Sequence, residues 1–117
     1  MTHRSFPPTI LTAMGRTVLV AAAVLLTSAA AAQPAAVAVD ITKFAFAPKE
    51  VTVVPGTKVV WTNHDDTPHT VAATDKRFAS KGLDTGDRFE HTFDDEGDYA
   101  YLCTVHPFMT GVVHVRK

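Results

Sequence analysis

The residues best suited to chemistry lie together near the end of the sequence, in a run from Cys103 to Met109. This run contains the only cysteine of the chain, and His106 and Met109 follow it at intervals of three. A thiolate, an imidazole and a thioether form a soft donor set, which suits copper better than magnesium or calcium, whose preferred ligands are oxygen atoms. Zinc would accept the sulfur and the nitrogen, but its usual ligands do not include a thioether. The run therefore predicts a copper-binding loop.

A complete copper site of this kind needs a second histidine from another part of the chain. Blue-copper sites combine one Cys and two His in a trigonal plane with a weak axial Met. His69 is the candidate, because it follows Pro68, whose ring restricts the backbone, and precedes a short apolar run that begins at Val71. Two separate segments are thus expected to supply four ligands to one copper ion.

Two motifs in the chain resemble those of the cupredoxins, a family of small blue-copper electron carriers. They are Pro68-His69-Thr70-Val71 and Tyr99-x-Tyr101-x-Cys103-x-x-His106-Pro107-Phe108-Met109-x-Gly111. The resemblance, which is strongest to members with a short ligand loop, implies a type 1 copper site with Cys103, His69 and His106 in the plane and Met109 in the axial position. It also implies that electrons leave through His106, with Pro107 and Phe108 at its rim. Cupredoxins often have asparagine at the position of Thr70, so here a threonine hydroxyl is expected to help hold the thiolate.

Each of these residues also has an ordinary structural explanation. Cys103 could be a simple buried thiol, Met109 could fill the core, and the two histidines could be surface residues. Four residues at the spacing of one metal site favour joint ligation over four coincidences. The remaining histidines are expected to be structural or exposed, and they are His3, His64, His91 and His114.

The first 32 residues are interpreted as a secretory signal peptide, followed by one domain at 33–117. Arg4 and Arg16 precede an uncharged apolar run from 17 to 32, and Ala30-Ala31-Ala32 fits the small-residue cleavage pattern. The alternative is an uncleaved membrane anchor, but this run of 16 residues is shorter than the ~20 that a spanning helix needs. We therefore expect export to a bacterial periplasm and no stable membrane insertion after cleavage.

Without this leader the chain has nine Lys and Arg against twelve Asp and Glu, a formal net charge of −3. Binding to nucleic acid depends on clustered basic residues that neutralise phosphates. The basic residues here are scattered, so a nucleic-acid-binding protein is not expected.

The sequence after the leader alternates between apolar and polar residues, as half-buried strands do. Val37, Val39 and Ile41 mark the first strand, and Phe44 and Phe46 extend its apolar stretch. Further strands are predicted at 51–54, 57–63, 69–74, 88–93, 99–103 and 111–115, with a long loop at 75–86 that crosses from one sheet to the other. No stretch has sustained helical periodicity. The prediction is an all-β fold, a Greek-key β-sandwich of about seven strands.

An immunoglobulin-like module is a rival fold, because Asp95-x-Gly97-x-Tyr99 resembles the tyrosine corner of those domains. Their second cysteine follows the tyrosine by two residues and pairs with a cysteine on another strand. Here Cys103 follows Tyr99 by four and has no partner cysteine, so this alternative is unsupported.

The expected function is single-electron transfer by one type 1 copper ion, without enzymatic activity. Four protein ligands leave no position for a substrate, in contrast to catalytic metal sites. A Cys–His hydrolase would need a third group to orient the histidine, and copper enzymes of related fold need His-x-His pairs that this chain lacks. The protein is expected to be a monomer that docks redox partners transiently near His106. Copper delivery or buffering with the same four ligands is the alternative.

Overall fold

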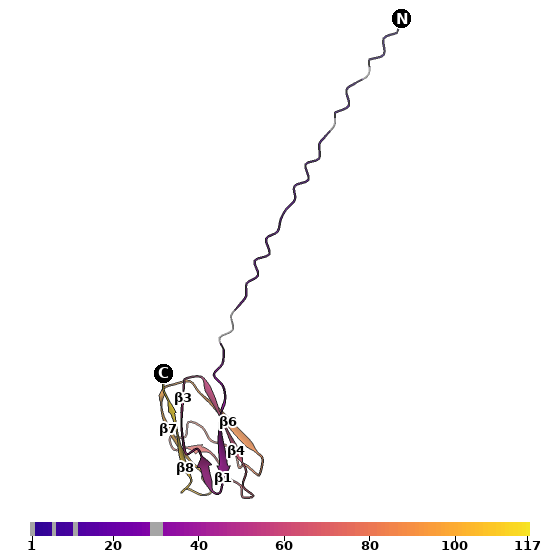
Figure 1. Cartoon of the computed structure of the whole chain (residues 1–117). Helices are drawn as coiled ribbons and strands as arrows, with labels where there is room; N and C mark the ends of the chain where they lie inside the picture. Colours follow the sequence, from indigo (N-terminus) through magenta and orange to yellow (C-terminus); the bar gives the residue numbers. More distant parts are fainter. Residues whose placement is uncertain (1, 6, 11, 29–31) are drawn as a thin grey trace. The chain divides into compact units, whose positions relative to one another are not determined.

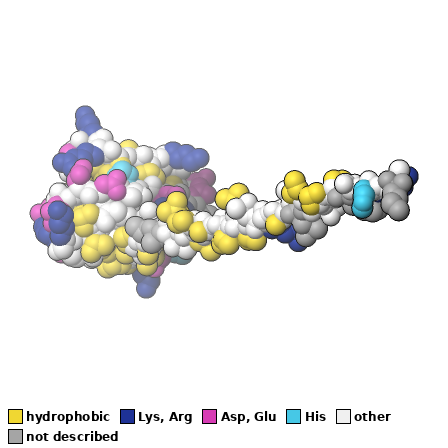
Figure 2. Space-filling view, turned by 90° about the horizontal axis from the view of Figure 1, so that it is seen from above, with side chains coloured by type: hydrophobic (Ala, Val, Ile, Leu, Met, Phe, Trp, Pro, Cys, Tyr) yellow, Lys and Arg dark blue, Asp and Glu magenta, His cyan; other side chains and the backbone are white. Residues whose placement is uncertain are grey.

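The computed structural model describes all residues except 1, 6, 11 and 29–31 (Figure 1). It contains two units, Met1–Ala30 and Ala31–Lys117. The described residues of the first unit form neither helix nor strand, and their large apolar side chains are exposed, from 79% at Val24 to 93% at Leu19 (Figure 2). Within the described parts of the chain, no helix is long and apolar enough to cross a membrane. Two residues of the predicted cleavage motif, Ala30 and Ala31, lie outside the described residues.

The second unit is a sandwich of two four-stranded sheets. One sheet has the order β2-β1-β4-β6 and contains β1 (Val37–Thr42), β2 (Ala45–Ala47), β4 (Thr57–Asn63) and β6 (Arg88–Phe93). The other has the order β3-β8-β7-β5 and contains β3 (Glu50–Val53), β5 (Ala72–Ala73), β7 (Gly97–Leu102) and β8 (Thr110–Val115). The predicted all-β sandwich is confirmed, with eight strands.

Each sheet contains one parallel pair of strands. β1 runs parallel to β4, β3 runs parallel to β8, and the other neighbours are antiparallel. Parallel neighbours cannot be joined by a tight hairpin, so the chain crosses repeatedly between the two layers that Figure 1 shows. The segment between β5 and β6 makes one of these crossings, as predicted for the long loop at 75–86.

The predicted bounds were accurate where side chains alternate strictly. β4 and β6 have the predicted bounds, and in β4 Val59 and Trp61 are both fully buried. The predicted strand at 69–74 was too long, because only Ala72 and Ala73 pair with β7. His69 instead forms an isolated bridge with Leu83 in the crossing loop. The apolar stretch at 45–47 is a separate strand, β2, which turns back antiparallel to β1.

The core lies between the sheets and is rich in aromatic rings. Trp61 packs against Tyr101 with ring centroids 5.4 Å apart, and Tyr101 packs against Phe46 at 4.8 Å. Burial raises the pKa of Tyr101 to about 12, so this ring stays neutral. Cys103 and His69 are also fully buried, and Cys103 belongs to this core.

The corner before β7 has the hydrogen bond of a tyrosine corner. The hydroxyl of Tyr99 donates to the backbone carbonyl of Asp95 over 2.8 Å. Each of the two sheets here contains one parallel pair of strands, whereas the sheets of immunoglobulin domains are antiparallel. The immunoglobulin-like alternative is therefore wrong.

Candidate metal centre

The loop from Cys103 to Met109 is the tight connection between β7 and β8. Its ends are fixed because Leu102 and Thr110 pair across the two strands. Inside the loop, the Cys103 amide donates to the Met109 carbonyl over 3.0 Å, and the Met109 amide donates to the His106 carbonyl over 2.9 Å. Sheet register and two short backbone bonds therefore hold this loop in one conformation.

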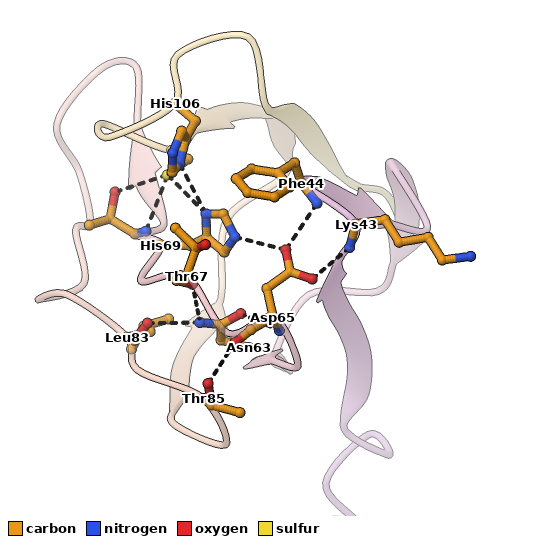
Figure 3. A network of polar contacts seen from close by, with 11 residues as sticks. Lys43, Phe44, Asn63, Asp65, Thr67, His69, Leu83, Thr85 and His106 are labelled. Carbon is orange, nitrogen blue, oxygen red and sulfur yellow. Dashed lines mark hydrogen bonds and ion pairs between the residues drawn. The ribbon is translucent and has the colours of Figure 1, made fainter.

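His69 reaches the same place from the segment before β5. Its amide donates to the Leu83 carbonyl over 3.1 Å, and the Leu83 amide donates back to the His69 carbonyl over 2.7 Å. These reciprocal bonds anchor the backbone of His69 to the crossing loop and direct its ring towards Cys103 and His106 (Figure 3).

The structure brings His69, Cys103 and His106 together with the separations that one metal ion requires. The two Nδ1 atoms of the histidines are 3.2 Å apart, and Sγ of Cys103 lies 3.8 Å from Nδ1 of His69 and 3.9 Å from Nδ1 of His106. Metal–nitrogen and metal–sulfur bonds of about 2.0–2.3 Å can bridge donors up to about 4.3 Å apart. The donor set of one thiolate and two imidazole nitrogens suits copper, so these residues fit a type 1 copper ion.

Polar hydrogens around Cys103 favour its thiolate form. The Thr70 amide donates to Sγ over 3.3 Å. Burial alone would raise the pKa of the thiol, but hydrogen bonds, chiefly those from the backbone amides of Thr70 and His106, lower it to about 6. The thiolate that a metal needs is therefore favoured by the protein itself.

The side chain of Thr70 acts mainly on the ligand loop. Its hydroxyl lies 3.9 Å from Sγ, but it accepts a bond of 2.8 Å from the Thr104 amide and lies 2.8 Å from the Thr104 hydroxyl. The threonine was expected to hold the thiolate through its hydroxyl; the shorter contact comes from its backbone amide. Its hydroxyl links the His69 segment to the residue that follows Cys103.

A carboxylate not singled out from the sequence fixes the far side of the His69 ring. Asp65 accepts a hydrogen bond from Nε2 of His69 over 2.8 Å, and it also accepts bonds from the backbone amides of Lys43 and Phe44 (Figure 3). Burial opposes ionisation of Asp65, but the Phe44 amide, the His69 ring and the Lys43 amide together lower its pKa. Its place four residues before His69 was the available signal, although nothing in a polar loop indicates which carboxylate turns inward.

The other predicted site residues border His106. Met109 is buried, with 2% exposure, whereas Pro107 is exposed and Phe108 is 72% exposed. Phe44, which the sequence did not indicate, packs edge-on against both His69 and His106 with centroids 5.2 and 5.1 Å apart. Beside these rings is a surface depression of about 200 Å³ lined by Phe44, Ala45, Phe46, Lys49, Phe108, Met109 and Thr110.

The histidines that were not expected to bind metal lie outside this cluster. His64 is an exposed partner of Asp40, His91 stacks on Phe78, and His114 lies between Asp98 and Glu50. His3 belongs to the first unit.

Comparison with known proteins agrees with the fold and the donor set. Residues 33–116 match the profile of copper binding proteins of the plastocyanin/azurin family. The chain is 39% identical to amicyanin of Paracoccus versutus over 94 residues, covering 75% of this chain and 71% of that protein. A purple cupredoxin from Nitrosopumilus maritimus superposes with a TM-score of 0.65 at 35% identity, covering 68% of this chain and 99% of that one.

A copper-containing nitrite reductase from Thermus scotoductus also shares the fold, with a TM-score of 0.68 at 30% identity. This match covers 74% of the present chain but only 24% of the enzyme, so it concerns one domain of a larger protein.

An eight-stranded sandwich with a buried Cys–His pair and a second, less buried histidine defines a cupredoxin. The chain belongs to the plastocyanin/azurin family of copper binding proteins. Its 39% sequence identity to amicyanin of Paracoccus versutus and its donor residues make it an amicyanin-like type 1 copper protein.

Proposed function

We propose that this protein is a periplasmic carrier of single electrons and not an enzyme, with one copper ion held by His69, Cys103, His106 and Met109. The observation that carries the proposal is the uneven exposure of these four residues. His69 and Cys103 are fully buried and Met109 is 2% exposed, whereas His106 is partly exposed. Such a site has no room for a substrate, but one ligand reaches the surface.

Bound copper would supply reversible Cu(I)/Cu(II) chemistry, and each residue would have its own task. Cys103 offers a thiolate that hydrogen bonds already favour. His69 and His106 would offer their Nδ1 atoms, and Met109 would offer its thioether sulfur. Because the ligands are held by strand register and backbone bonds, little rearrangement would accompany a change of charge.

Partners would dock at the apolar surface around His106. Phe44 and Val105 are 43% and 56% exposed, and Phe108 is 72% exposed. Such a small apolar surface suits the weak, short-lived contacts of redox encounters. It also suits a carrier that remains a monomer when no redox partner is bound. On the face shown in Figure 2, basic and acidic side chains are interspersed, which supports the absence of nucleic-acid binding.

The deciding experiment adds one equivalent of Cu(II) to residues 33–117 and records visible absorption, voltammetry and retention of Cu(I) against a chelator. An intense blue band, reversible one-electron voltammetry and retained Cu(I) are expected. The band should vanish in Cys103→Ser and persist in the control His64→Gln, which removes a histidine outside the cluster. Ready loss of Cu(I) to the chelator would favour copper delivery, and a colourless protein that binds zinc equally well would exclude both functions.

The proposed location needs a separate test. The uncharged run at 17–32 and the exposure of its apolar side chains support a leader that is removed on export. Fractionation of cells that express the full chain, with sequencing of the mature N-terminus, should recover the domain in the periplasm starting near Gln33. Recovery of the uncut chain in the membrane fraction would favour the anchor instead.

A further inference from the structure

The carboxylate of Asp65 contacts both the predicted metal ligand His69 and the backbone of the partly exposed Phe44. The side chain of Asp65 is 13% exposed. Its Oδ1 accepts the Lys43 amide over 2.7 Å, and its Oδ2 accepts both the Phe44 amide over 2.9 Å and Nε2 of His69 over 2.8 Å. Both oxygens are therefore used, by the adjacent amides of Lys43 and Phe44, which precede Asp65 by more than twenty residues, and by the ring of His69 (Figure 3).

Asp65 is itself held firmly. Its amide donates to the side-chain oxygen of Asn63 over 2.9 Å, and its carbonyl accepts the Thr85 hydroxyl over 2.7 Å. Asn63 is fully buried, and its amide group donates to the carbonyls of Thr67 and Leu83 over 3.0 and 2.8 Å. The position of the carboxylate therefore follows from a satisfied network that begins in β4.

The bond to His69 selects one tautomer of its ring. A carboxylate can only accept, so Nε2 must carry the hydrogen. The lone pair is then on Nδ1, the atom that faces Sγ of Cys103 and Nδ1 of His106. A hydrogen-bonded partner on the second ring nitrogen is how proteins orient a metal-binding imidazole.

The bonds to Lys43 and Phe44 stabilise a backbone that few residues adopt. Their φ angles are 51° and 55°, in the left-handed region that side chains with a Cβ disfavour. Two consecutive left-handed residues present adjacent amides to one carboxylate. This turn places the Phe44 ring edge-on against His69 and His106 while leaving it 43% exposed at the surface depression.

We propose that Asp65 is a positioning residue that orients His69 for the metal and also holds the Lys43–Phe44 turn that places Phe44 at the docking surface. The proposal extends the proposed function, because it makes one carboxylate responsible for a buried ligand and for part of the rim where a partner would bind. Two of its three measurements do not involve copper.

The first test uses the unmodified metal-free protein at a pH where histidine is neutral. Long-range ¹H–¹⁵N correlations should show His69 as the Nε2–H tautomer, and the amides of Lys43 and Phe44 should be protected from hydrogen exchange despite their exposed position. A dominant Nδ1–H tautomer, or unprotected amides at both positions, would overturn the proposal without any substitution.

The second test compares Asp65→Asn with Asp66→Asn, which removes the same charge from an exposed neighbour. An asparagine cannot accept all three bonds. Exchange at Lys43 and Phe44 should therefore rise roughly ten- to a hundredfold, the usual strength of a hydrogen bond to a charged group. Amides in β6 should keep their protection, and Asp66→Asn should leave all of them unchanged.

The third measurement is the reduction potential of the copper-loaded variants. Loss of the carboxylate should favour Cu(I) over Cu(II) by about tenfold, a rise of about 59 mV for a one-electron couple, while Asp66→Asn shifts it much less. Equal shifts in both variants would mean that the Asp65 carboxylate acts on the copper only through its negative charge, and this result would refute the positioning role. If the wild type forms no blue site while the metal-free results hold, the proposed function fails and the positioning role stands.

Discussion

The side chain of Tyr101 occupies the place that a side chain at Gly111 would need. Tyr101 of β7 pairs directly with Gly111 of β8, and the tyrosine ring lies over the glycine. A Cβ added at Gly111 would overlap Cζ and Oη of the ring and come within 2.8 Å of Cε2. The ring cannot retreat easily, because Phe46 and Trp61 pack against it at 4.8 and 5.4 Å. We therefore predict that Gly111→Ala strongly destabilises the domain.

The expected loss can be estimated from the cost of overpacking, which is about 1–3 kcal/mol for an extra methyl group in a full core. The confined ring places this substitution at the upper end. For a domain of this size, about 3 kcal/mol corresponds to a fall in Tm of about 12–24 °C. Urea and thermal unfolding of the metal-free domain, followed by circular dichroism, measure both quantities.

Two controls separate the clash from a general effect of alanine. Gly82 has nothing within 4 Å of an added Cβ, so Gly82→Ala should stay within about 0.5 kcal/mol of wild type. In a Tyr101→Leu background, which lacks the overlapping atoms, Gly111→Ala should lose most of its effect, giving a coupling energy of about 2 kcal/mol. An unchanged stability of Gly111→Ala, or the same loss in both backgrounds, would refute the reasoning.

Three further predictions concern metal and pH. Copper at a hundred times its dissociation constant should stabilise the domain by about 2.7 kcal/mol, measured as a rise in Tm that a chelator reverses. Thiolate absorbance of metal-free Cys103 should titrate near pH 6, because its hydrogen bonds outweigh burial; a midpoint near pH 9 would contradict this. Hydrogen bonds to Asp98 and Glu50 raise the pKa of His114 above its usual 6.5, so its contribution to stability is complete below that pH and is lost as the pH rises through the raised value. The stability gap to His114→Gln in urea should therefore narrow between pH 6 and pH 9, and a constant gap would exclude this linkage.

The parts of the fold that were predictable are those with a local signature. In β4, the buried Val59 and Trp61 lie two positions apart on one face, and in β6, Phe89 and Phe93 alternate with polar residues, so both strands have the predicted bounds. The strand at 69–74 was predicted from the short apolar run that begins at Val71, but His69 is bonded to Leu83 in the crossing loop. The backbone of His69 therefore bonds to the crossing loop and not to β7. This choice depends on a contact between residues distant in the sequence, so the local sequence does not show it.

The metal donors were predictable for a different reason. Cys103, His106 and Met109 lie on one short loop, so their spacing already reports their proximity. Asp65 carries only a weak signal, because it precedes His69 by four residues but is one of two adjacent aspartates. Phe44 carries no signal, because it follows a lysine in a left-handed turn without glycine. Their roles depend on hydrogen bonds across 21 and 22 residues.

The position of β8 has a consequence for the order in which the protein can be made. β8 is the last strand of the chain, yet it lies between β3 and β7 inside its sheet. Until residues 110–115 have left the ribosome, β3 lacks its strand partner and the loop of Cys103 lacks the second of its two anchoring strands. The metal centre is thus assembled only after β8 has been synthesised, and a chain truncated before β8 would carry Cys103 in a loop that lacks one of its two anchoring strands.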